Sequence, residues 1–523
     1  MTDAAIETLL AGLPARLNQL VRTWAERTPD APALKEGACI WSYRQLDAAL
    51  NLAARWLDEI GVRAGDRVML VGENCMAQVA LIFAAAAIDA WMVNVNARLS
   101  EREIELIRKH SGARRVLYLS ANSSDALNHA VQAGAVPQTL EFLGELSLGG
   151  LDEHCEAHAC AASNAVQVAA LVYTTGTTGS PKGVMLTHRN LLFIAAVSST
   201  LRELTPHDRV YGVLPISHVY GLTSVMLGTL YAGACLQLVP RYTPQALVHA
   251  LQHDGITVVQ GVPAMYARLL EWLQDGAKLG ARRPRFIYAG GSPLDPTLKR
   301  QVEELFGLPL HNGYGMTESS PTISQTRLAA PRTDTSVGHL IPGVAMRLVD
   351  REARDVPTGE VGELWVRGPN VMKGYYADPA LSARTLQAGE WLNTGDLARQ
   401  GSDGALFIVG RTKELIIHSG FNVYPVEVEA ALNSHPAVTQ SAVVGRQVVG
   451  GNEEVLAFVE LAAGSTVEPA ELRHHLADLL APYKCPAEIV IMPALPAAAT
   501  GKILKGQLKQ QAQQAYDALQ STR

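Results

Sequence analysis

Short apolar runs alternate with helical patterns over roughly the first two-thirds of the chain. Residues 67–71 and 91–95 have the length and composition of buried strands. The segments after them, 77–87 and 101–110, have the length and pattern of helices. The alternation continues to an apolar run at 286–288. It predicts an α/β fold in which helices connect the strands of parallel sheets, arranged here as two subdomains.

The pattern changes near residue 335, where short apolar runs are separated by Pro-Gly and Thr-Gly turns. Turns at such close intervals predict a small β-barrel-like subdomain. The last segment mixes helices and strands again, and roughly 110 residues suffice for a small α+β domain. Its expected elements are helices at 425–433 and 469–480 and strands at 438–444, 455–461 and 488–492. We therefore divide the chain into an N-terminal domain, 1–410, and a C-terminal domain, 411–523.

Composition narrows the class of protein. The chain has 523 residues, of which 48% are hydrophobic and 18% charged, so a core-forming globular protein of more than one domain is expected. A net charge of −6 without a Lys/Arg block argues against a nucleic-acid partner. Six scattered cysteines suit a reducing compartment. The apolar stretch 79–95, interrupted by Asp89, fits a buried helix and strand better than a transmembrane segment. No secretory leader is evident, and we expect a cytoplasmic protein.

One cluster imitates a metal site. Four side chains that can bind zinc lie within seven residues: His154, Cys155, His158 and Cys160. Structural zinc sites normally use two separated ligand pairs that close a loop between them, and no second pair lies near this segment. We therefore interpret 154–160 as a solvent-facing linker.

Residues 173–183, Tyr-Thr-Thr-Gly-Thr-Thr-Gly-Ser-Pro-Lys-Gly, interleave hydroxyl side chains with glycines and one lysine. Glycines let the backbone approach a ligand, and N–H groups, hydroxyls and an ammonium can surround phosphate oxygens. Apolar runs at 168–172 and 184–186 flank the stretch and predict a phosphate-binding turn between two strands. The Walker spacing fails, because its second glycine would fall on Pro181. The alternative is a surface loop rich in Thr, Ser and Gly.

Two further stretches end in carboxylates. His311-Asn-Gly-Tyr-Gly-Met-Thr317-Glu318 follows an apolar run at 308–310 and predicts a strand that feeds a glycine-rich turn. Glu318 suits Mg²⁺, and Thr317 can contact phosphate or metal; the alternative is a tight turn with a solvated glutamate. The second stretch, 391–396, ends in Asp396 after a turn. A carboxylate that accepts both ribose hydroxyls is a device of dinucleotide-binding folds.

Together these motifs resemble, in the expected order from about residue 170 to 505, the adenylate-forming superfamily, which includes acyl- and aryl-CoA ligases. Those enzymes activate a carboxylate with ATP and Mg²⁺ to an acyl-adenylate and pyrophosphate, and many then pass the acyl group to coenzyme A. The resemblance implies that the phosphates are bound by Thr174, Thr175, Gly176, Thr177, Thr178 and Lys182. It implies that Thr174 and Glu318 hold Mg²⁺, and that Lys502 neutralises charge at the α-phosphate and the attacking carboxylate.

The resemblance also implies where the nucleoside lies. Tyr314 stacks on adenine, and Asp396 binds the ribose with Arg411 as its partner. The remaining nucleotide-site residues are Gly291, Ser292, Asn312, Gly313 and Gly315. The segment 214–222 lines the acyl pocket, where His218 gates the adenylate; a histidine satisfied within a turn is the alternative. Ala497 departs from the arginine common in the family, but Gly501-Lys502 and the Ile-Leu-Lys after it are retained.

For the second half-reaction the resemblance implies a mobile C-terminal domain that rotates about Lys413. The rotation brings Ser419 and Gly420 toward the thiol channel. No phosphopantetheine-carrier domain follows Lys505, so coenzyme A is the expected acceptor. A freestanding ligase that loads a separate carrier protein is an alternative. A catalytically dead acyl-binding or sensor protein would need a lost motif residue, and none is lost.

The acid is expected to be a monocarboxylate. Relatives that act on malonate-type diacids carry an arginine where this chain has Gly313, which leaves space for a tail. The run 419–425 looks most like bacterial fatty-acyl-CoA ligases, which favours an aliphatic chain; an aryl acid such as a benzoate or cinnamate is the alternative. The partners are thus a carboxylic acid, ATP and coenzyme A, and a homodimer is left open.

Overall fold

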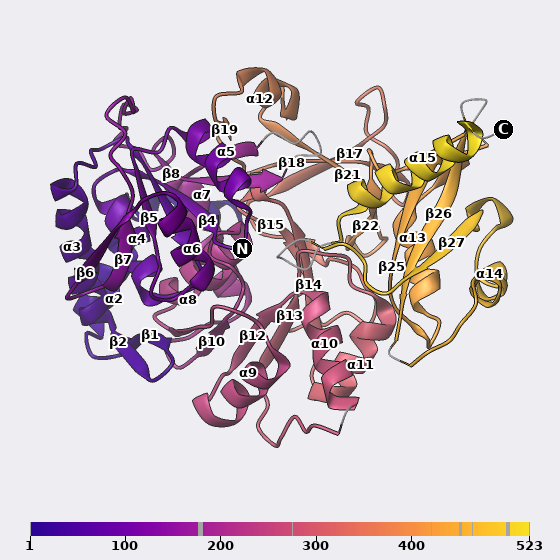
Figure 1. Ribbon diagram of the computed structural model, residues 1–523, viewed down its shortest axis with the longest axis horizontal. Helices are drawn as coiled ribbons and strands as arrows, with labels where there is room; N and C mark the ends of the chain where they lie inside the picture. Colours follow the sequence, from indigo (N-terminus) through magenta and orange to yellow (C-terminus); the bar gives the residue numbers. More distant parts are fainter. Residues whose placement is uncertain are drawn as a thin grey trace.

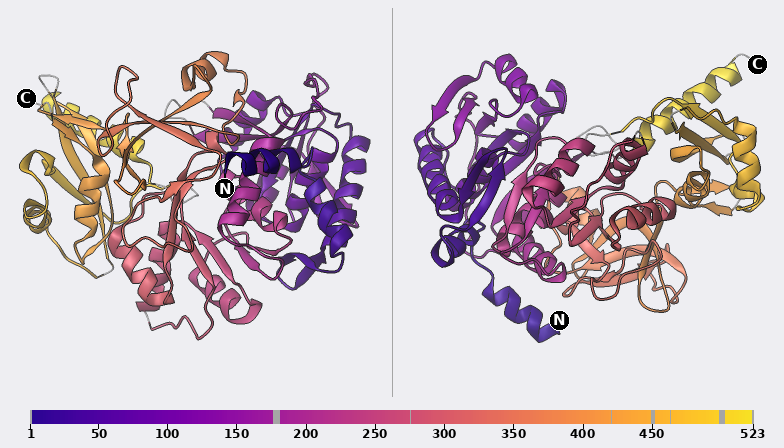
Figure 2. Two further views of the ribbon diagram at one scale, coloured as in Figure 1. Left: turned by 180° about the vertical axis from the view of Figure 1, so that it is seen from behind. Right: turned by 90° about the horizontal axis from the view of Figure 1, so that it is seen from below.

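The computed structural model describes residues 2–175, 181–274, 276–419, 421–448, 452–462, 464–497 and 503–521. Up to about residue 340 the chain forms two mixed sheets with helices between them and on their outer faces (Figure 1). A small antiparallel sheet and a C-terminal α+β unit follow (Figure 2). This is the predicted fold class.

The first sheet has the strand order β16-β15-β14-β13-β12-β10-β11-β1-β2. Its centre is parallel, and its two edges are antiparallel. The strands are β1 (Pro32–Glu36), β2 (Cys39–Ser42), β10 (Arg209–Gly212), β11 (Cys235–Leu238), β12 (Val258–Gly261), β13 (Phe286–Ala289), β14 (Leu310–Gly315), β15 (Thr322–Gln325) and β16 (His339–Leu340).

The second sheet has the order β19-β9-β8-β4-β3-β5-β7-β6, again with a parallel centre. Its strands are β3 (Arg67–Gly72), β4 (Trp91–Asn96), β5 (Arg115–Tyr118), β6 (Val136–Leu140), β7 (Gly144–Leu148), β8 (Val168–Thr175), β9 (Pro181–Thr187) and β19 (Gly374–Tyr375). Strands β8 and β9 form an antiparallel hairpin, and β19 joins its outer edge from a distant part of the chain.

The helices form three layers around the two sheets. Helix α4 (Met76–Ala87) contacts β1 of the first sheet and β3 and β4 of the second, so it lies between them. It is buried on all sides, which explains its nearly uninterrupted apolar sequence. The other helices of this region are α1 (Asp3–Gly12), α2 (Gln19–Arg27), α3 (Tyr43–Glu59), α5 (Glu101–Ser111), α6 (Ser124–Gln132), α7 (His188–Leu201), α8 (Gly228–Tyr231), α9 (Pro244–His249), α10 (Pro263–Gln274) and α11 (Pro296–Phe306).

The small sheet carries long strands with alternating burial. It has the order β17-β18-β21-β20, and β22 pairs with β21. The elements are β17 (Ala345–Val349), β18 (Val361–Arg367), α12 (Pro379–Thr385), β20 (Leu386–Gln387), β21 (Trp391–Gln400) and β22 (Leu406–Arg411). Side chains along β21 are alternately buried and half-buried, so one face of the strand packs against the protein.

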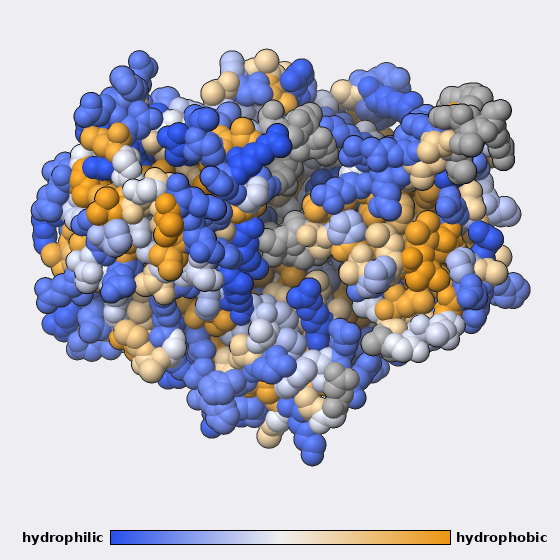
Figure 3. Space-filling model, viewed as in Figure 1, coloured by the Kyte–Doolittle hydropathy of each residue, from blue (hydrophilic) through white to orange (hydrophobic). Residues whose placement is uncertain are grey.

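The C-terminal unit is built on the sheet β25-β26-β27. Helices α13 and α14 pack on one face of this sheet and α15 on the other. The elements are β23 (Ile416–His418), β24 (Phe421–Val423), α13 (Pro425–Asn433), β25 (Val438–Gln447), β26 (Glu453–Leu461), α14 (Pro469–Ala477), η4 (Pro482–Lys484), β27 (Glu488–Met492) and α15 (Lys505–Ser521). Figure 3 shows an apolar area over this unit, which exposes Phe421, Leu479 and Ile491.

Most expected strands and helices are present within a few residues of their predicted ends, and α13 and β27 agree residue for residue. The apolar segment near 221–232 also predicts a helix, and a helix is present: η1 (Tyr220–Leu227) is π-helical and continues into α8. A second π-helical turn, η2 (Ala250–Asp254), ends the helix that begins with α9. Of the helices in the described ranges, none has both the length and the apolar content needed to cross a bilayer.

Two histidines buried in the core make the stability of the protein depend on pH. The His188 side chain is 0% exposed at the start of α7, and His311 is 5% exposed in β14. Burial lowers the pKa of His188 to about 3 and the pKa of His311 to about 4, because neither imidazole can be solvated when charged. Both side chains are therefore neutral in the folded protein at neutral pH.

The folded protein should lose stability as the pH falls below about 6.5, the ordinary pKa of histidine. Above that pH both states keep these histidines neutral; below it only the unfolded state takes up protons, until the folded pKa values near 3 and 4 are reached. At pH 5 the expected loss in free energy of unfolding is about 2 kcal/mol for each histidine. Urea unfolding at pH 7 and pH 5 measures it. His188→Asn and His311→Gln should each reduce the difference, whereas His474→Asn, at an exposed position, should not. An undiminished difference in both buried variants would contradict this account.

Candidate active site

The predicted phosphate-binding turn lies between β8 and β9, as expected. Thr174 on β8 is paired with Lys182 on β9, and Thr175 with Pro181, so both ends of the turn are held by the hairpin. Gly176, Thr177 and Thr178 lie outside the described residues. After β9, Thr187 caps helix α7: its hydroxyl accepts a hydrogen bond from the Asn190 N–H (3.2 Å), and the Asn190 side chain accepts one from the Thr187 N–H (2.8 Å). The hairpin is thus fixed to a buried helix.

The strand β19 joins the hairpin to the predicted magnesium glutamate. Gly374 and Tyr375 pair with Met185 and Val184 of β9. The Tyr375 hydroxyl donates a 2.7 Å hydrogen bond to Glu318 Oε1. Burial, and then the negative charge of Glu318, raise the pKa of Tyr375 well above its ordinary value, so the hydroxyl keeps its proton. Sequence reasoning missed Tyr375, because it lies 57 positions from Glu318 and in no recognised motif.

Glu318 and Thr317 lie in a short 3-10 turn, η3 (Thr317–Ser319), directly after β14. Both side chains are buried. Within the described ranges no Lys, Arg or His lies within ion-pair distance of the Glu318 carboxylate. A buried carboxylate without a protein cation fits a metal ligand, because an unpaired buried charge is costly.

The stretch before Glu318 corrects the sequence prediction. A strand ending at Leu310 and then a glycine-rich turn were expected, but β14 continues in extended form to Gly315. The reason is close packing. A Cβ at Gly315 would lie 2.0 Å from the Pro321 carbonyl oxygen, and a Cβ at Gly313 would lie 1.8 Å from the Tyr288 hydroxyl. The glycines therefore let a strand pass where no side chain fits.

Gly313 leaves no free space for a substrate tail at that point, contrary to the expectation, because the Tyr288 hydroxyl fills it. Its neighbour Asn312 is buried and fixed within the protein. The Asn312 side chain accepts a hydrogen bond from the Gly313 N–H (2.8 Å) and donates to the carbonyls of Thr335 and Ser336 (3.3 Å each).

Asp396 and Arg411, predicted to bind the ribose, are in contact, and Tyr314, predicted to stack on adenine, joins them through its hydroxyl. Asp396 is buried within β21 rather than after a turn, which is a second correction, and it is paired in register with Arg411 of β22. Arg411 Nε lies 3.1 Å from Asp396 Oδ1, and the Tyr314 hydroxyl donates to Asp396 Oδ2. Burial, and then the charge of Asp396, raise the pKa of Tyr314 well above its ordinary value. Burial alone would lower the pKa of Arg411, but the carboxylates of Asp396 and Glu414 outweigh it and raise that pKa.

The turn after β13 contains the exposed Gly291 and the half-buried Ser292. Gly291 has a φ of +84°, a conformation that favours glycine. His218 lies in the predicted acyl segment, where its Nδ1 accepts a 3.2 Å hydrogen bond from the Tyr220 N–H. This segment is fixed by Asn74, whose side chain donates to the Gly212 and Leu214 carbonyls and accepts from the Ile216 N–H. Asn74 lies 140 positions from Leu214, so no local motif indicated it.

The predicted hinge and its surroundings are partly described. Lys413 lies in an exposed turn after β22. The Ser419 N–H donates a 2.7 Å hydrogen bond to the Asn452 side chain. Gly420 and Lys502 lie outside the described residues. At the start of α15, Lys505 Nζ lies 2.7 Å from Glu429 and 3.4 Å from Glu414, so the residue next to the hinge is ion-paired to the last helix.

The segment 154–160 forms no helix or strand and is mostly exposed, as the linker interpretation expects, although Cys155 is buried and His158 is half-buried. Cys155 is buried, with its Sγ 3.7 Å from Asp66 Oδ1. His158 stacks on Trp91, with ring centroids 4.4 Å apart. His154 and Cys160 are exposed, and Cys155 and His158 contact different residues, so the four potential ligands do not converge. Among the described residues no three or more His, Cys, Asp or Glu side chains form a metal-binding group.

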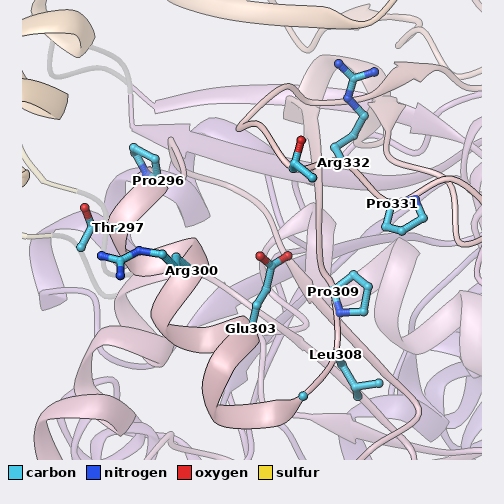
Figure 4. A pocket seen from close by; sticks show the side chains of 10 residues that line it. Pro296, Thr297, Arg300, Glu303, Leu308, Pro309, Pro331 and Arg332 are labelled. Atoms are coloured by element: carbon cyan, nitrogen blue, oxygen red, sulfur yellow. The ribbon is translucent and has the colours of Figure 1, made fainter.

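A hollow of about 690 Å³ lies away from these motifs, between α11 and residues 331–333 (Figure 4). Its charged side chains are already paired. Arg332 lies 2.5 Å from Asp334 and also contacts Asp403, and Glu303 pairs with Lys299. The hollow therefore offers little free charge to a ligand.

Comparison with known proteins agrees with this geometry. Residues 21–376 match the AMP-binding enzyme family, and residues 427–502 match the AMP-binding enzyme C-terminal domain. A feruloyl-CoA synthase of Amycolatopsis sp is 32% identical over 508 residues, covering 94% of this chain and 99% of that protein. A 2-succinylbenzoate–CoA ligase of Geobacillus kaustophilus is 33% identical, with coverage of 92% and 95%.

Solved structures give the same picture. ATP-bound MatB from Rhodopseudomonas palustris superposes with a TM-score of 0.83 at 28% identity, covering 96% of this chain and all of MatB. A benzoate CoA ligase from Burkholderia xenovorans LB400 superposes with a TM-score of 0.81 at 28% identity, covering 94% and 99%. The two sequence relatives and this ligase are named for acids with an aromatic ring, so they do not support the expected aliphatic preference. The chain belongs to the AMP-binding enzyme family and is an acyl-CoA synthetase of the adenylate-forming superfamily.

Proposed function

We propose that this enzyme is an aryl-acid CoA ligase, which uses ATP to convert a benzoate- or cinnamate-type acid first to the aryl-adenylate and then to the aryl-CoA thioester. The observation that carries the proposal is the hydrogen bond from Tyr375 to Glu318, which joins the phosphate hairpin to a buried carboxylate that has no cationic partner among the described residues. The aryl preference rests on the named substrates of the relatives and replaces the aliphatic alternative.

In the first half-reaction two anions must meet, so the protein contributes mainly positioning and charge. Asp396 accepts the ribose hydroxyls, and Arg411 and the Tyr314 hydroxyl hold its carboxylate in place. Lys182, paired with Thr174 at the base of the hairpin, reaches the β- and γ-phosphates. Glu318 and Thr174 are the residues that would hold Mg²⁺, which would neutralise phosphate charge when bound. Lys502 approaches the α-phosphate and the attacking carboxylate.

In the second half-reaction the sulfur of coenzyme A attacks the acyl carbonyl, and AMP leaves with the bonding electrons of the acyl–oxygen bond. The unit from residue 411 to the C-terminus rotates about Lys413 and moves Lys502 away. Ser419 and Gly420 then face the thiol channel. A cytoplasmic enzyme fits the six free cysteines. An enzyme that loads a carrier protein would make the same adenylate but would not turn over with coenzyme A.

Pyrophosphate release tests the reaction and the class of acid. We expect ferulate, cinnamate or benzoate to accelerate release by at least about tenfold over hexanoate and octanoate, because a flat ring loses less conformational entropy on binding than a flexible chain. Thioester should appear only when coenzyme A is added. Faster release with the aliphatic acids would contradict the aryl preference, and adenylate formation without thioester would favour the carrier-loading alternative.

Tyr375→Phe tests whether this hydroxyl positions Glu318. Loss of a hydrogen bond to a charged group should lower kcat/KM for adenylation by about 10- to 100-fold and raise the Mg²⁺ concentration needed for half-maximal rate. Glu318→Gln should have a larger effect. The matched control is Tyr376→Phe, which removes the neighbouring hydroxyl, 3.3 Å from His158. If both Tyr variants responded alike to Mg²⁺, the role given to Tyr375 would be wrong.

Lys413→Pro tests the hinge. Proline fixes φ and so restricts the backbone rotation that domain movement needs. We expect adenylation, followed by pyrophosphate release, to be retained within about threefold, and thioester formation from preformed acyl-adenylate to fall by about 100-fold or more. Equal loss of both half-reactions would count against a hinge at this residue.

A further inference from the structure

A buried polar cluster lies behind the turn that contains Gly291. It consists of Arg202, Gln260, Tyr288 and Gln325, and we call it the Arg202 cluster. Arg202 Nη1 donates a 2.7 Å hydrogen bond to the Gln260 side-chain oxygen, and Arg202 Nη2 donates one of 3.4 Å to the Gln325 side-chain oxygen. The guanidinium carbon lies 4.7 Å from the centre of the Tyr288 ring. Arg202 is 1% exposed and Gln260 is 0% exposed.

The positive charge of this cluster has no counter-charge among the residues that the structure describes. Within the described part of the chain, no carboxylate lies within 4.0 Å of the Arg202 guanidinium. Asp208 is paired with Arg285 at 2.7 Å instead. A second arginine near Tyr288, Arg327, is also without a carboxylate partner in the described residues, and burial lowers its pKa. Burying an uncompensated guanidinium is costly, so an anion is expected to approach it at some stage of function.

Among the described residues, several buried polar atoms near Tyr288 or in η1 also lack hydrogen-bond partners. They are Arg202 Nε, Gln260 Nε2, the Tyr220 hydroxyl, Thr223 Oγ1 and Arg327 Nη1. Buried polar atoms are normally hydrogen-bonded, so such a group points to a ligand. All five can donate a proton, and the nitrogen atoms among them can only donate. The missing ligand group is therefore a hydrogen-bond acceptor, and the net positive charge favours an anionic one.

Tyr288 connects this cluster to the acyl side of the active site. Its hydroxyl occupies the place that a side chain at 313 would take, directly before Tyr314. Its ring packs against the Tyr220 ring in the predicted acyl segment, with centroids 6.3 Å apart. Tyr220 and Thr223 both lie in the π-helix η1, whose Ser224 carbonyl accepts a 3.2 Å hydrogen bond from Arg202. The Arg202 cluster therefore adjoins the predicted acyl segment through Tyr288, Tyr220 and Ser224.

We propose that the Arg202 cluster binds an oxygen acceptor at the end of the aryl acid remote from the carboxylate that is activated. The inference rests on the proposed function and deepens it: the substrate class is an aryl acid with a distal phenol or, better, a second carboxylate. It also revises the expectation of a monocarboxylate, which rested on Gly313 alone. The distal oxygen accepts from Arg202 Nε and Gln260 Nε2, and no bond is made or broken there.

Matched acids and variants test the proposal through kcat/KM for pyrophosphate release. The acids are cinnamate, 4-hydroxycinnamate and 4-carboxycinnamate, with benzoate, 4-hydroxybenzoate and terephthalate as a shorter series. For the native enzyme we expect kcat/KM to be at least about tenfold higher for a 4-hydroxy or 4-carboxy acid than for the unsubstituted acid in one of the two series. The reason is that unpaired buried donors reject a ligand that has no acceptor. A higher kcat/KM for the carboxylate than for the phenol would assign the preference to charge. A higher kcat/KM for the phenol would assign it to neutral hydrogen bonding.

Arg202→Met and Gln260→Met remove the unpartnered donors at similar volume, and each should reduce that ratio by at least about tenfold. The control is Gln237→Met, a buried glutamine in β11 that donates to Asp254 instead and should leave the ratio unchanged. If thermal unfolding shows that Arg202→Met is not folded, the ratio measured for Gln260→Met decides whether the proposal holds. Aryl acids that react without preference, or a ratio unchanged in the folded variants, would overturn the inference and leave the proposed function standing. No adenylation of any aryl acid would overturn both.

Discussion

The hydrogen bond between Tyr375 and Glu318 is the contact on which the arrangement of the site depends. Glu318 follows a strand of the first sheet, whereas the phosphate hairpin belongs to the second. A layer of helices lies between much of the two sheets, but strand β9 of the hairpin and the η3 turn come into direct contact. Strand β19 strengthens this contact because it adds to the hairpin edge and directs Tyr375 at Glu318. The Met372 N–H adds a second link, a 2.9 Å hydrogen bond to the Glu318 carbonyl.

The same principle holds on the ribose side. Asp396 and Arg411 are cross-strand neighbours in the small sheet, whereas Tyr314 belongs to β14 of the first sheet. The Tyr314 hydroxyl therefore ties two sheets together at one carboxylate. Each acidic group of the predicted nucleotide site is thus held by a tyrosine from another sheet. Phenolic hydroxyls suit this task because burial keeps them protonated and so able to donate.

The sequence allowed the strands, the helices and the order of the motifs to be predicted, because these depend on local patterns. Hydrophobic periodicity placed β3, α4 and β4, and the motif at 173–183 placed the hairpin. Contacts between residues far apart in the chain could not be predicted, because they produce no local sequence pattern. Asn74, Tyr375 and Tyr288 act on segments far from them in the chain, and a single sequence shows no trace of that pairing. Gly313 illustrates the error that results: the sequence suggested open space, whereas the structure places a tyrosine hydroxyl there.

In our proposal, two buried charges that have no ion-pair partner among the described residues lie at the two ends of the site. Glu318 has no cation and Arg202 has no carboxylate within ion-pair distance among the described residues. In a folded protein such charges are tolerated only where another partner compensates them. A carboxylate beside a phosphate hairpin is complementary to a metal ion, and a guanidinium beside an acyl segment is complementary to an acidic substrate. In our proposal Arg202 attracts the distal anionic group of the acid, which leaves the other carboxylate to be presented to ATP.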